Sequence, residues 1–201
     1  KKTFLFKTPG MFLGIDSSTQ SLTGVLIDPS NGEIMAQHSV NFGAEFPDYG
    51  CPSGFIPGGA NGVVHSNPLM WLEALDVLFS RLADSADLSR LKLIAGSGQQ
   101  HGSVYLDGSF NQRLASLDPT SSLKSQIAPA LTRITSPIWM DTSTGAECSE
   151  ITTEMGGASE VCRLSGSIAI ERFTGPQIRR FYKEDPVAYA RTAHIHLVSS
   201  F

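Results

Sequence analysis

Two apolar runs joined by a short polar turn give this chain its strongest structural constraint. The segment LGIDSSTQSLTGVLID covers residues 13–28, and each of its apolar runs has the length of a β-strand. Only a tight turn fits between them, so the two strands must pair antiparallel. A second turn signal, DPSNG, precedes an alternating segment at residues 33–41. The sequence therefore predicts an antiparallel meander of three strands.

Loop and helix signals follow the meander. Residues 43–66 are rich in glycine and proline and predict a long loop, a feature that often has a functional role in compact domains. Asn67 suits a helix N-cap and Pro68 the first helical position. Apolar residues then recur at helical spacing, at Leu69, Leu72, Leu75, Phe79 and Leu82. Farther along, the patterns predict a buried strand at 92–97, strands at 104–107 and in HIHLVSSF, and helices at 142–155, 158–164, from Pro176, and at 187–192.

Composition excludes several classes of protein. The 201 residues can bury a core without disulfides, and the net charge of −4 lacks the basic face of a nucleic-acid binder. No apolar run approaches the roughly 20 residues of a membrane span, and KKTFLFKTPG lacks the apolar core of a signal peptide. The three cysteines, Cys51, Cys148 and Cys162, are odd in number and form no CxxC pair. We therefore expect a cytoplasmic protein without nucleic-acid or membrane partners, and leave a homodimer open.

The polar turn at the end of the first strand suggests a phosphate site. Asp16 ends that strand, and Ser17, Ser18 and Thr19 follow it at once. Successive N–H groups of a turn form concavities that bind anions. A carboxylate repels a bare phosphate but suits one that carries Mg²⁺, so Asp16 would lie next to the metal. A polar hairpin in which Asp16 forms only an Asx-turn explains the same spacing and stays open as an alternative.

A second polar cluster, GSGQQHG, occupies residues 96–102. It nearly matches the dinucleotide motif GxGxxG, but His101 stands at the third glycine and a strand follows where a helix is required. Ser97 does not lie in the GxSxG motif of a nucleophile elbow. What remains is a group of amides and an imidazole, of which Gln100 and His101 suit hydrogen bonds to a polyol. The alternative is a polar turn whose histidine has a protein partner.

A third group lies farther along the chain. Trp139 offers an apolar wall, and Asp141, two residues later, offers a second acid near a metal or a sugar. Asp141 could equally cap the helix that follows. Arg172 lies in the segment ERFTG and could bind a ligand oxygen or pair with a surface acid.

Taken together, these segments resemble the FGGY carbohydrate kinases. LGIDSSTQSLTGVLID is similar to the first phosphate motif of actin-like sugar kinases, and GQQHG to the family's sugar-contacting segment, which usually has Met at the place of Gln100. PIWMDTST is similar to the Trp-x-Asp segment, although Ser143 stands where that segment often has Arg. GVVHSNPLMWLEALD, ERFTGPQI and HLVSSF resemble the xylulose-phosphorylating members, especially the eukaryotic ones. The resemblance covers about residues 11–201.

The resemblance implies an α/β fold of the ribonuclease-H-like, actin-like ATPase type. Its mixed sheet would have three antiparallel strands first, later strands parallel, and flanking helices on both faces. Residues 1–10 would be an N-terminal tail and residues 11–201 an incomplete N-terminal, sugar-binding kinase domain. The C-terminal ATP-binding domain, with the aspartate that acts as catalytic base, would lie outside this chain, so the 201 residues alone should be inactive.

The resemblance also implies a reaction, the ATP-dependent phosphorylation of D-xylulose or a similar ketopentose to its 5-phosphate. ATP and Mg²⁺ would be required, and Asp16, Ser17, Ser18 and Thr19 would face the Mg-bound phosphates. The sugar pocket would be lined by Gln100, His101, Trp139, Asp141 and Arg172. Two alternatives remain open, a noncatalytic sugar sensor on the same fold and a related kinase acting on ribulose, glycerol or gluconate.

Overall fold

The computed structural model describes residues 10–201, so the expected tail lies outside the described residues except for Gly10. The predicted meander is present as β1 (Met11–Ser17), β2 (Ser21–Ile27) and β3 (Ile34–Asn41). β2 pairs antiparallel with both of its neighbours. The Ser18 N–H donates to the Ser21 carbonyl at 2.9 Å and closes the turn between β1 and β2.

A fourth strand makes this sheet a mixed one. β5 (Leu91–Gly98) runs parallel to β1, and the strand order is β3-β2-β1-β5. The sequence predicted that this strand is buried, and this is wrong, because Leu93 and Ile94 are each 53% exposed. The reason is that β5 is an edge strand, whereas the covering helix packs over β2 and β3.

That covering helix is α2 (Pro68–Ser85), which begins where the sequence predicted. The Asn67 side chain accepts a hydrogen bond from the Leu69 N–H at 3.0 Å and caps it. Gly24 of β2 lets the helix approach closely, since a Cβ there would meet Leu78 and Leu82 at 3.1–3.2 Å. The buried face of the helix differs in part from the predicted stripe and consists of Pro68, Met70, Trp71, Leu72, Ala74, Leu78 and Leu82.

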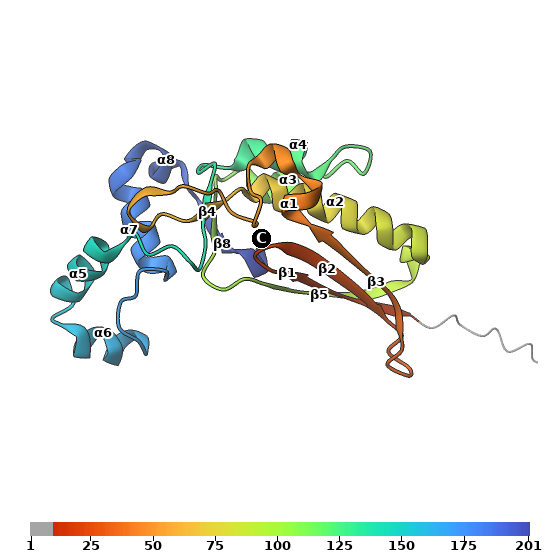
Figure 1. Cartoon of the computed structure of the whole chain (residues 1–201), viewed down its shortest axis with the longest axis horizontal. Helices are drawn as coiled ribbons and strands as arrows, with labels where there is room; N and C mark the ends of the chain where they lie inside the picture. Colours follow the sequence, from red (N-terminus) through yellow and green to blue (C-terminus); the bar gives the residue numbers. More distant parts are fainter. Residues whose placement is uncertain (1–9) are drawn as a thin grey trace, which may run out of the picture.

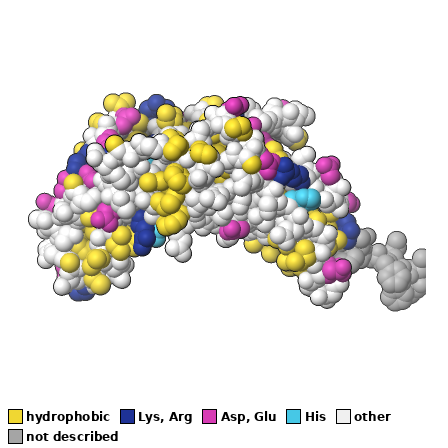
Figure 2. All heavy atoms as spheres, viewed as in Figure 1, with side chains coloured by type: hydrophobic (Ala, Val, Ile, Leu, Met, Phe, Trp, Pro, Cys, Tyr) yellow, Lys and Arg dark blue, Asp and Glu magenta, His cyan; other side chains and the backbone are white. Residues whose placement is uncertain are grey.

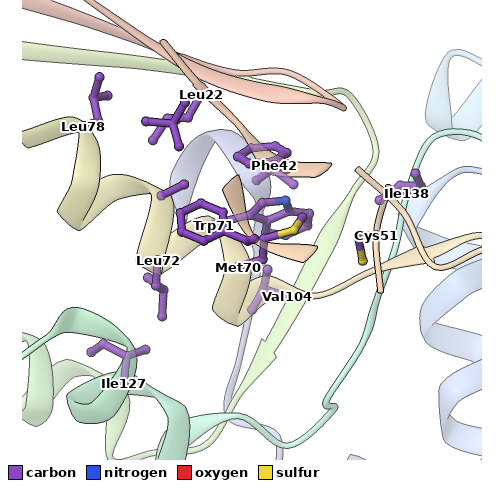
Figure 3. Packing of buried hydrophobic residues seen from close by; sticks show 14 of the residues in the cluster. Leu22, Phe42, Cys51, Met70, Trp71, Leu72, Leu78, Val104, Ile127 and Ile138 are labelled. Atoms are coloured by element: carbon purple, nitrogen blue, oxygen red, sulfur yellow. The ribbon is translucent and has the colours of Figure 1, made fainter. Parts of the chain in front are cut away.

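The main core lies between α2 and the meander and continues toward the shorter strands. Figure 3 shows Trp71, Met70 and Phe42 packed together, with Val104 beside them. On the other face of the sheet, Phe12 of β1 and Leu93 of β5 are 39% and 53% exposed. The described helices therefore cover one face of the four-stranded sheet, and not both as the resemblance implied (Figure 1).

Two short strand pairs connect the sheet to a second group of helices. β4 (His65–Ser66) pairs with β7 (Ser136–Pro137), and β6 (Ser103–Leu106) pairs with β8 (His194–Leu197), both antiparallel. The implied parallel arrangement of later strands is thus correct for β5 and wrong for β6 and β8. The remaining helices are α1 (Phe42–Glu45), α3 (Phe110–Ala115), α4 (Leu123–Ile127), α5 (Gly145–Glu154), α6 (Ala158–Ser165), α7 (Thr174–Glu184) and α8 (Pro186–Arg191).

The overall shape is an arch. One arm contains α5, α6 and α7, and the other is the far end of the sheet (Figure 1). In the space-filling view, the lower edge of the molecule is hollowed between these two arms (Figure 2). Across residues 10–201, none of the helices combines the length and the apolar character needed to cross a membrane.

The predicted long loop contains short ordered elements. α1 overlaps its start, two 3₁₀ turns follow at Pro47–Tyr49 and Ala60–Gly62, and β4 ends it. Gly54 has a φ of +83°, and a Cβ there would lie 1.8 Å from the Thr19 carbonyl oxygen. Only glycine allows this approach. The segment therefore packs directly against the turn that follows Asp16.

Candidate functional site

One cavity of about 420 Å³ brings together most of the predicted site residues. It lies beyond the ends of β1 and β5, where the chain leaves the sheet, and further side chains come from the segments before α5 and α7. Asp16 and His101, far apart in the sequence, both line it. The lining residues are Asp16, Ser18, Thr19, Gly98, Gln99, Gln100, His101, Trp139 and Arg172.

The turn after β1 lines the cavity through three of its four predicted residues. Asp16 is exposed, and its carboxylate accepts a hydrogen bond from the Ser97 hydroxyl on the neighbouring strand. The Ser18 hydroxyl donates to the Ser21 carbonyl at 3.0 Å. The Thr19 hydroxyl accepts a hydrogen bond from the Trp139 indole N–H at 2.9 Å. This hydrogen bond therefore joins the turn that is predicted to bind phosphate directly to the predicted apolar wall.

Ser17 differs from the other residues of the turn. Side chains alternate along a strand, so Ser17 points to the opposite face from Asp16. It is only 8% exposed and lines a separate, mostly apolar cavity of about 150 Å³ beside Trp71 and Leu72. The structure thus separates the Ser17 side chain from the predicted phosphate-binding group. Its carbonyl oxygen accepts a hydrogen bond from the Gln99 N–H at 2.8 Å and ties the two strand ends together.

His101 has an unusual backbone conformation at the rim of the cavity. Its φ is +62°, and positive φ is costly for a residue other than glycine and is often found at functional sites. The ring packs on Phe173, with 4.8 Å between ring centroids. Burial, and then the charge of Arg172, lower the pKa of His101 below its usual value. The imidazole is therefore neutral near pH 7 and presents one donor and one acceptor.

Arg172 and Trp139 complete the open side of the cavity. Arg172 is exposed and makes no hydrogen bond or ion pair with any residue in the range 10–201. Trp139 is 41% exposed. Gln100 lines the cavity as predicted, and so does Gln99, which the sequence reasoning overlooked although it lies in the same GQQHG run. Phe173, which supports His101, was also overlooked, because nothing in the ERFTG segment indicates a ring contact.

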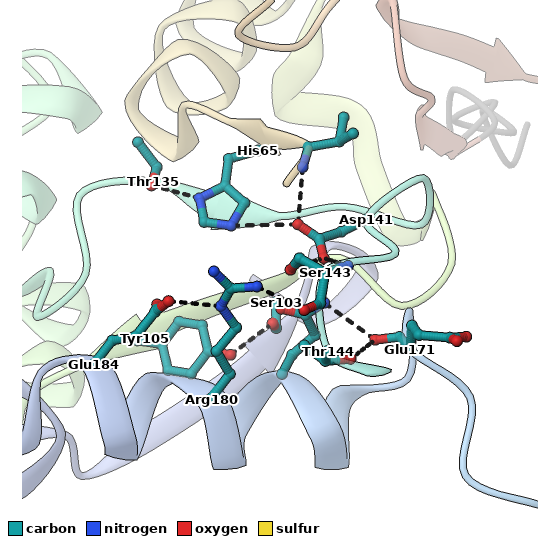
Figure 4. Close-up of polar contacts among 12 residues, drawn as sticks. His65, Ser103, Tyr105, Thr135, Asp141, Ser143, Thr144, Glu171, Arg180 and Glu184 are labelled. Atoms are coloured by element: carbon teal, nitrogen blue, oxygen red, sulfur yellow. Dashed lines mark hydrogen bonds and ion pairs between the residues drawn. The ribbon is translucent and has the colours of Figure 1, made fainter. Parts of the chain in front are cut away.

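Asp141 lies behind the cavity and is not among its lining residues. It is fully buried, and its carboxylate accepts hydrogen bonds from the N–H of Val64 at 2.8 Å and of Ser143 at 2.9 Å. Figure 4 shows it directed toward His65, whose Nε2 lies 3.6 Å away. Burial acts to raise the pKa of Asp141, but the hydrogen bonds from Ser143, Val64 and Gln177 outweigh it and lower that pKa. Asp141 is therefore an ionised, enclosed acceptor.

The donor set of the cavity fits a metal that is carried by phosphates. Asp16 is the only carboxylate among the lining residues. In the part of the chain that the structure describes, no three histidine, cysteine or acidic side chains are grouped to bind a metal ion. Mg²⁺ commonly takes one or two protein carboxylates and completes its shell with water and substrate phosphates. Asp16 fits the single-carboxylate case, and it does not form a protein-only metal site.

Comparison with known proteins finds clear relatives in sequence. No family model matches the chain. In sequence it is 43% identical over 193 residues to xylulose kinase 2 of Arabidopsis thaliana, and 45% identical over 191 residues to a xylulose kinase of Schizosaccharomyces pombe. Each alignment covers 95% of this chain and 34% of the relative. The chain thus spans about a third of the length of these curated relatives.

Solved structures agree on the fold. A xylulose kinase from Bifidobacterium adolescentis matches with a TM-score of 0.67 at 18% identity, over 95% of this chain and 33% of that one. A gluconate kinase from Lactobacillus acidophilus matches with a TM-score of 0.66 at 16% identity, over 93% and 31%. The chain therefore has part of the actin-like ATPase fold of the sugar kinases. Its curated relatives in sequence are xylulose kinases, and the solved structures it resembles are carbohydrate kinases.

Proposed function

We propose that this chain is the sugar-binding lobe of an ATP-dependent kinase that phosphorylates D-xylulose on its terminal hydroxyl. The observation that supports this most is the single cavity shared by Asp16, His101 and Arg172. An acid suited to Mg²⁺ faces a neutral imidazole and an unpaired guanidinium across a space large enough for a small ligand. The relatives named xylulose kinase supply the substrate class.

The residues of the cavity have distinct parts in this proposal. His101 offers one donor and one acceptor to sugar hydroxyls, and Arg172 offers several donors on a side chain that is free to turn toward the ligand. Gln100 adds an amide, and Trp139 provides an apolar wall against the carbon skeleton. Asp141 contributes from behind the cavity through the turn that contains Trp139. The catalytic base is expected outside this chain.

Asp16, Ser18 and Thr19 face the nucleotide phosphates in this proposal. Mg²⁺, bound to ATP, would neutralise phosphate charge, and Asp16 would hold it directly or through water. Phosphoryl transfer depends mainly on positioning and charge neutralisation, since little covalent chemistry falls to the protein. The chain's own contribution is to place the sugar hydroxyl opposite the phosphates. A cytoplasmic location and a homodimer stay predictions.

The test of this proposal is steady-state kinetics on a protein of the relatives' full length that carries this chain. His101→Ala should raise the KM for xylulose at least about tenfold, because a hydrogen-bonding ring inside the cavity is lost. His38→Ala, in β3, removes a half-buried imidazole that lies outside the cavity and bonds the Ser85 hydroxyl, and it should leave the KM unchanged. An unchanged KM for the His101 variant would remove His101 from the sugar site. Sustained turnover by the 201 residues alone would contradict the expected place of the base.

Thermal-shift and activity measurements with a panel of sugars and polyols can distinguish the alternative functions. A sugar sensor would be stabilised against heat by its sugar but would produce no ADP, whereas a kinase does both. Kinases for gluconate and glycerol share the fold, as the similar structures from Lactobacillus acidophilus and Plasmodium falciparum illustrate. Thermal shifts with xylulose, ribulose, glycerol and gluconate should be largest for xylulose. A larger shift with another compound would reassign the substrate.

A further inference from the structure

We propose that Thr144 and Gln177 are positioning residues that set Arg172 and His101 in the sugar site by fixing the backbone of the segment between α6 and α7. This inference rests on the proposed function. Neither side chain lines the cavity, and although Thr144 lies in PIWMDTST and Gln177 in ERFTGPQI, no sequence pattern assigns either one a role. Both are fully buried, with no exposed surface.

The two side chains converge on one carbonyl group. The Thr144 hydroxyl donates to the carbonyl oxygen of Glu171 at 2.5 Å. The Gln177 side-chain N–H₂ donates to the same oxygen at 3.1 Å. A carbonyl oxygen with two lone pairs can accept both bonds. The peptide that links Glu171 to Arg172 is therefore fixed from two directions, one from the start of α5 and one from within α7 (Figure 4 labels Thr144 and Glu171).

The orientation of the Gln177 amide is set by its neighbours. Its nitrogen also donates to the Asp141 carboxylate at 2.8 Å. Both partners are acceptors only, since one is an ionised carboxylate and the other a carbonyl. Turning the amide over would place its oxygen against two oxygens, which is repulsive. Gln177 thus links the buried carboxylate of Asp141 to the segment that contains Arg172.

The fixed peptide directly precedes the two residues that shape the cavity on this side. Arg172 has no partner among the described residues, so its placement depends on its backbone. Phe173 comes next and supports the His101 ring at 4.8 Å between centroids. A shift of the Glu171 carbonyl would move Arg172 and also remove the support of His101.

The same cluster reaches the opposite wall of the cavity. The Asp141 N–H donates to the Ile138 carbonyl at 2.9 Å and closes the turn that contains Trp139. One buried polar cluster, formed by Asp141, Thr144 and Gln177, therefore connects to Trp139 on one side and to Arg172 on the other. Buried polar groups cost free energy unless they are bonded, so a displacement that breaks the bonds of this cluster is costly, although Gln177 Oε1 itself has no hydrogen-bond partner among the described residues.

The experiment compares three variants and one control variant in a protein of the relatives' full length. Thr144→Val and Gln177→Met remove the donors at nearly constant volume. Each should raise the KM for xylulose about tenfold with kcat and the KM for ATP within about threefold of the parent. Thr144→Ser keeps the hydroxyl and should restore the KM. Thr152→Val is the matched control, because its hydroxyl bonds the Cys148 carbonyl within α5 and does not contact Glu171.

A merely structural role would give a different result. It would lower the melting temperature and the fraction of active enzyme, and so kcat, while the KM for xylulose stayed at the parent value, and that outcome would overturn the inference. If Gln177→Met does not fold, the pair Thr144→Val and Thr144→Ser decides alone. Failure of the proposed function shows itself separately, because the parent protein would then phosphorylate no ketopentose, and the inference would fall with it. The inference alone would be overturned if the parent protein is active, His101→Ala raises the KM for xylulose, and the Thr144 and Gln177 variants leave that KM unchanged.

Discussion

The two halves of the candidate site are built in contrasting ways. The turn from Asp16 to Thr19 is positioned locally, by two paired strands and one hydrogen bond between Ser18 and Ser21. The opposite half, with Trp139 and Arg172, is positioned by a buried carboxylate whose partners are distant in sequence, among them Val64 and Gln177. The first half follows from strand and turn patterns, whereas the second depends on the complete fold. The contrast shows that the wall of an open cavity can rest on a buried polar cluster.

The largest expected effect is at Gly54, in the loop that packs against the locally built half. Gly54→Ala would place a methyl group 1.8 Å from the Thr19 carbonyl oxygen, so the loop or the turn must move. Unfolding by urea should show a loss of about 4 kcal/mol. Gly58→Ala is the control, because its φ of +80° is nearly the same and a Cβ there meets nothing within 4 Å. Equal losses in the two variants would show that the close approach to Thr19 carries no cost.

The distant half should be next in sensitivity. Asp141→Asn replaces a buried acceptor with a group that turns an N–H₂ toward donors, and it should lower the free energy of unfolding by about 3 kcal/mol. Asp118→Asn provides the comparison. Asp118 likewise accepts bonds from the N–H and hydroxyl of a residue two positions on, but it is exposed, so its loss should stay below about 1 kcal/mol. Similar losses at both positions would mean that the burial of Asp141 does not increase the free energy lost on its substitution.

The two halves of the candidate site also differ in how much of their structure could be predicted from the sequence. The meander, the capped start of α2 at Asn67 and the gathering of Asp16 with the GQQHG segment follow from periodicity, turn residues and resemblance. Strand alternation also predicts that the Ser17 side chain points to the face opposite Asp16, although the motif grouped Ser17 with its neighbours. The burial of Asp141 and the roles of Thr144 and Gln177 do not follow from any local pattern, because their partners are set only when distant segments meet.

A pH titration sharpens the contrast through His65, which faces Asp141. Burial, together with Arg133, lowers the pKa of His65 to about 4, although Asp141 acts to raise it. Between pH 6.5 and 4 the unfolded chain binds more protons than the folded one, so stability falls on acidification by up to about 1.4 kcal/mol per pH unit. Below about pH 4 His65 is protonated in both the folded and the unfolded chain, so its contribution to the slope ends there. Asp141 stays ionised over the window, because its pKa is lowered.

Urea unfolding at a series of pH values measures that slope. His65→Gln should flatten the slope between pH 6.5 and 4. A slope unaffected by His65→Gln would show that this histidine takes up its proton equally in the folded and unfolded states.

The smallest effect is expected at the backbone of His101. His101→Gly and His101→Ala both remove the ring, but only glycine adopts a φ of +62° without strain. The glycine variant should be the more stable of the two by about 1 kcal/mol. At Gln100, where φ is not positive, the order should reverse, because glycine loses more chain entropy on folding. The same order at both positions would remove the argument for strain at His101.

The hydrogen bond between Trp139 and Thr19 has a spectroscopic consequence. The chain has two tryptophans, and Trp71 is 5% exposed whereas Trp139 is 41% exposed. The emission of Trp71 reports on the dry interior, and that of Trp139 on water in the cavity. A ligand that displaces this water, or pulls Thr19 away from the indole, would shift only the Trp139 component of the emission, which lies at the longer wavelength. The protein therefore has its own optical probe at the junction of its two candidate ligand positions, and Trp71→Phe would isolate that signal.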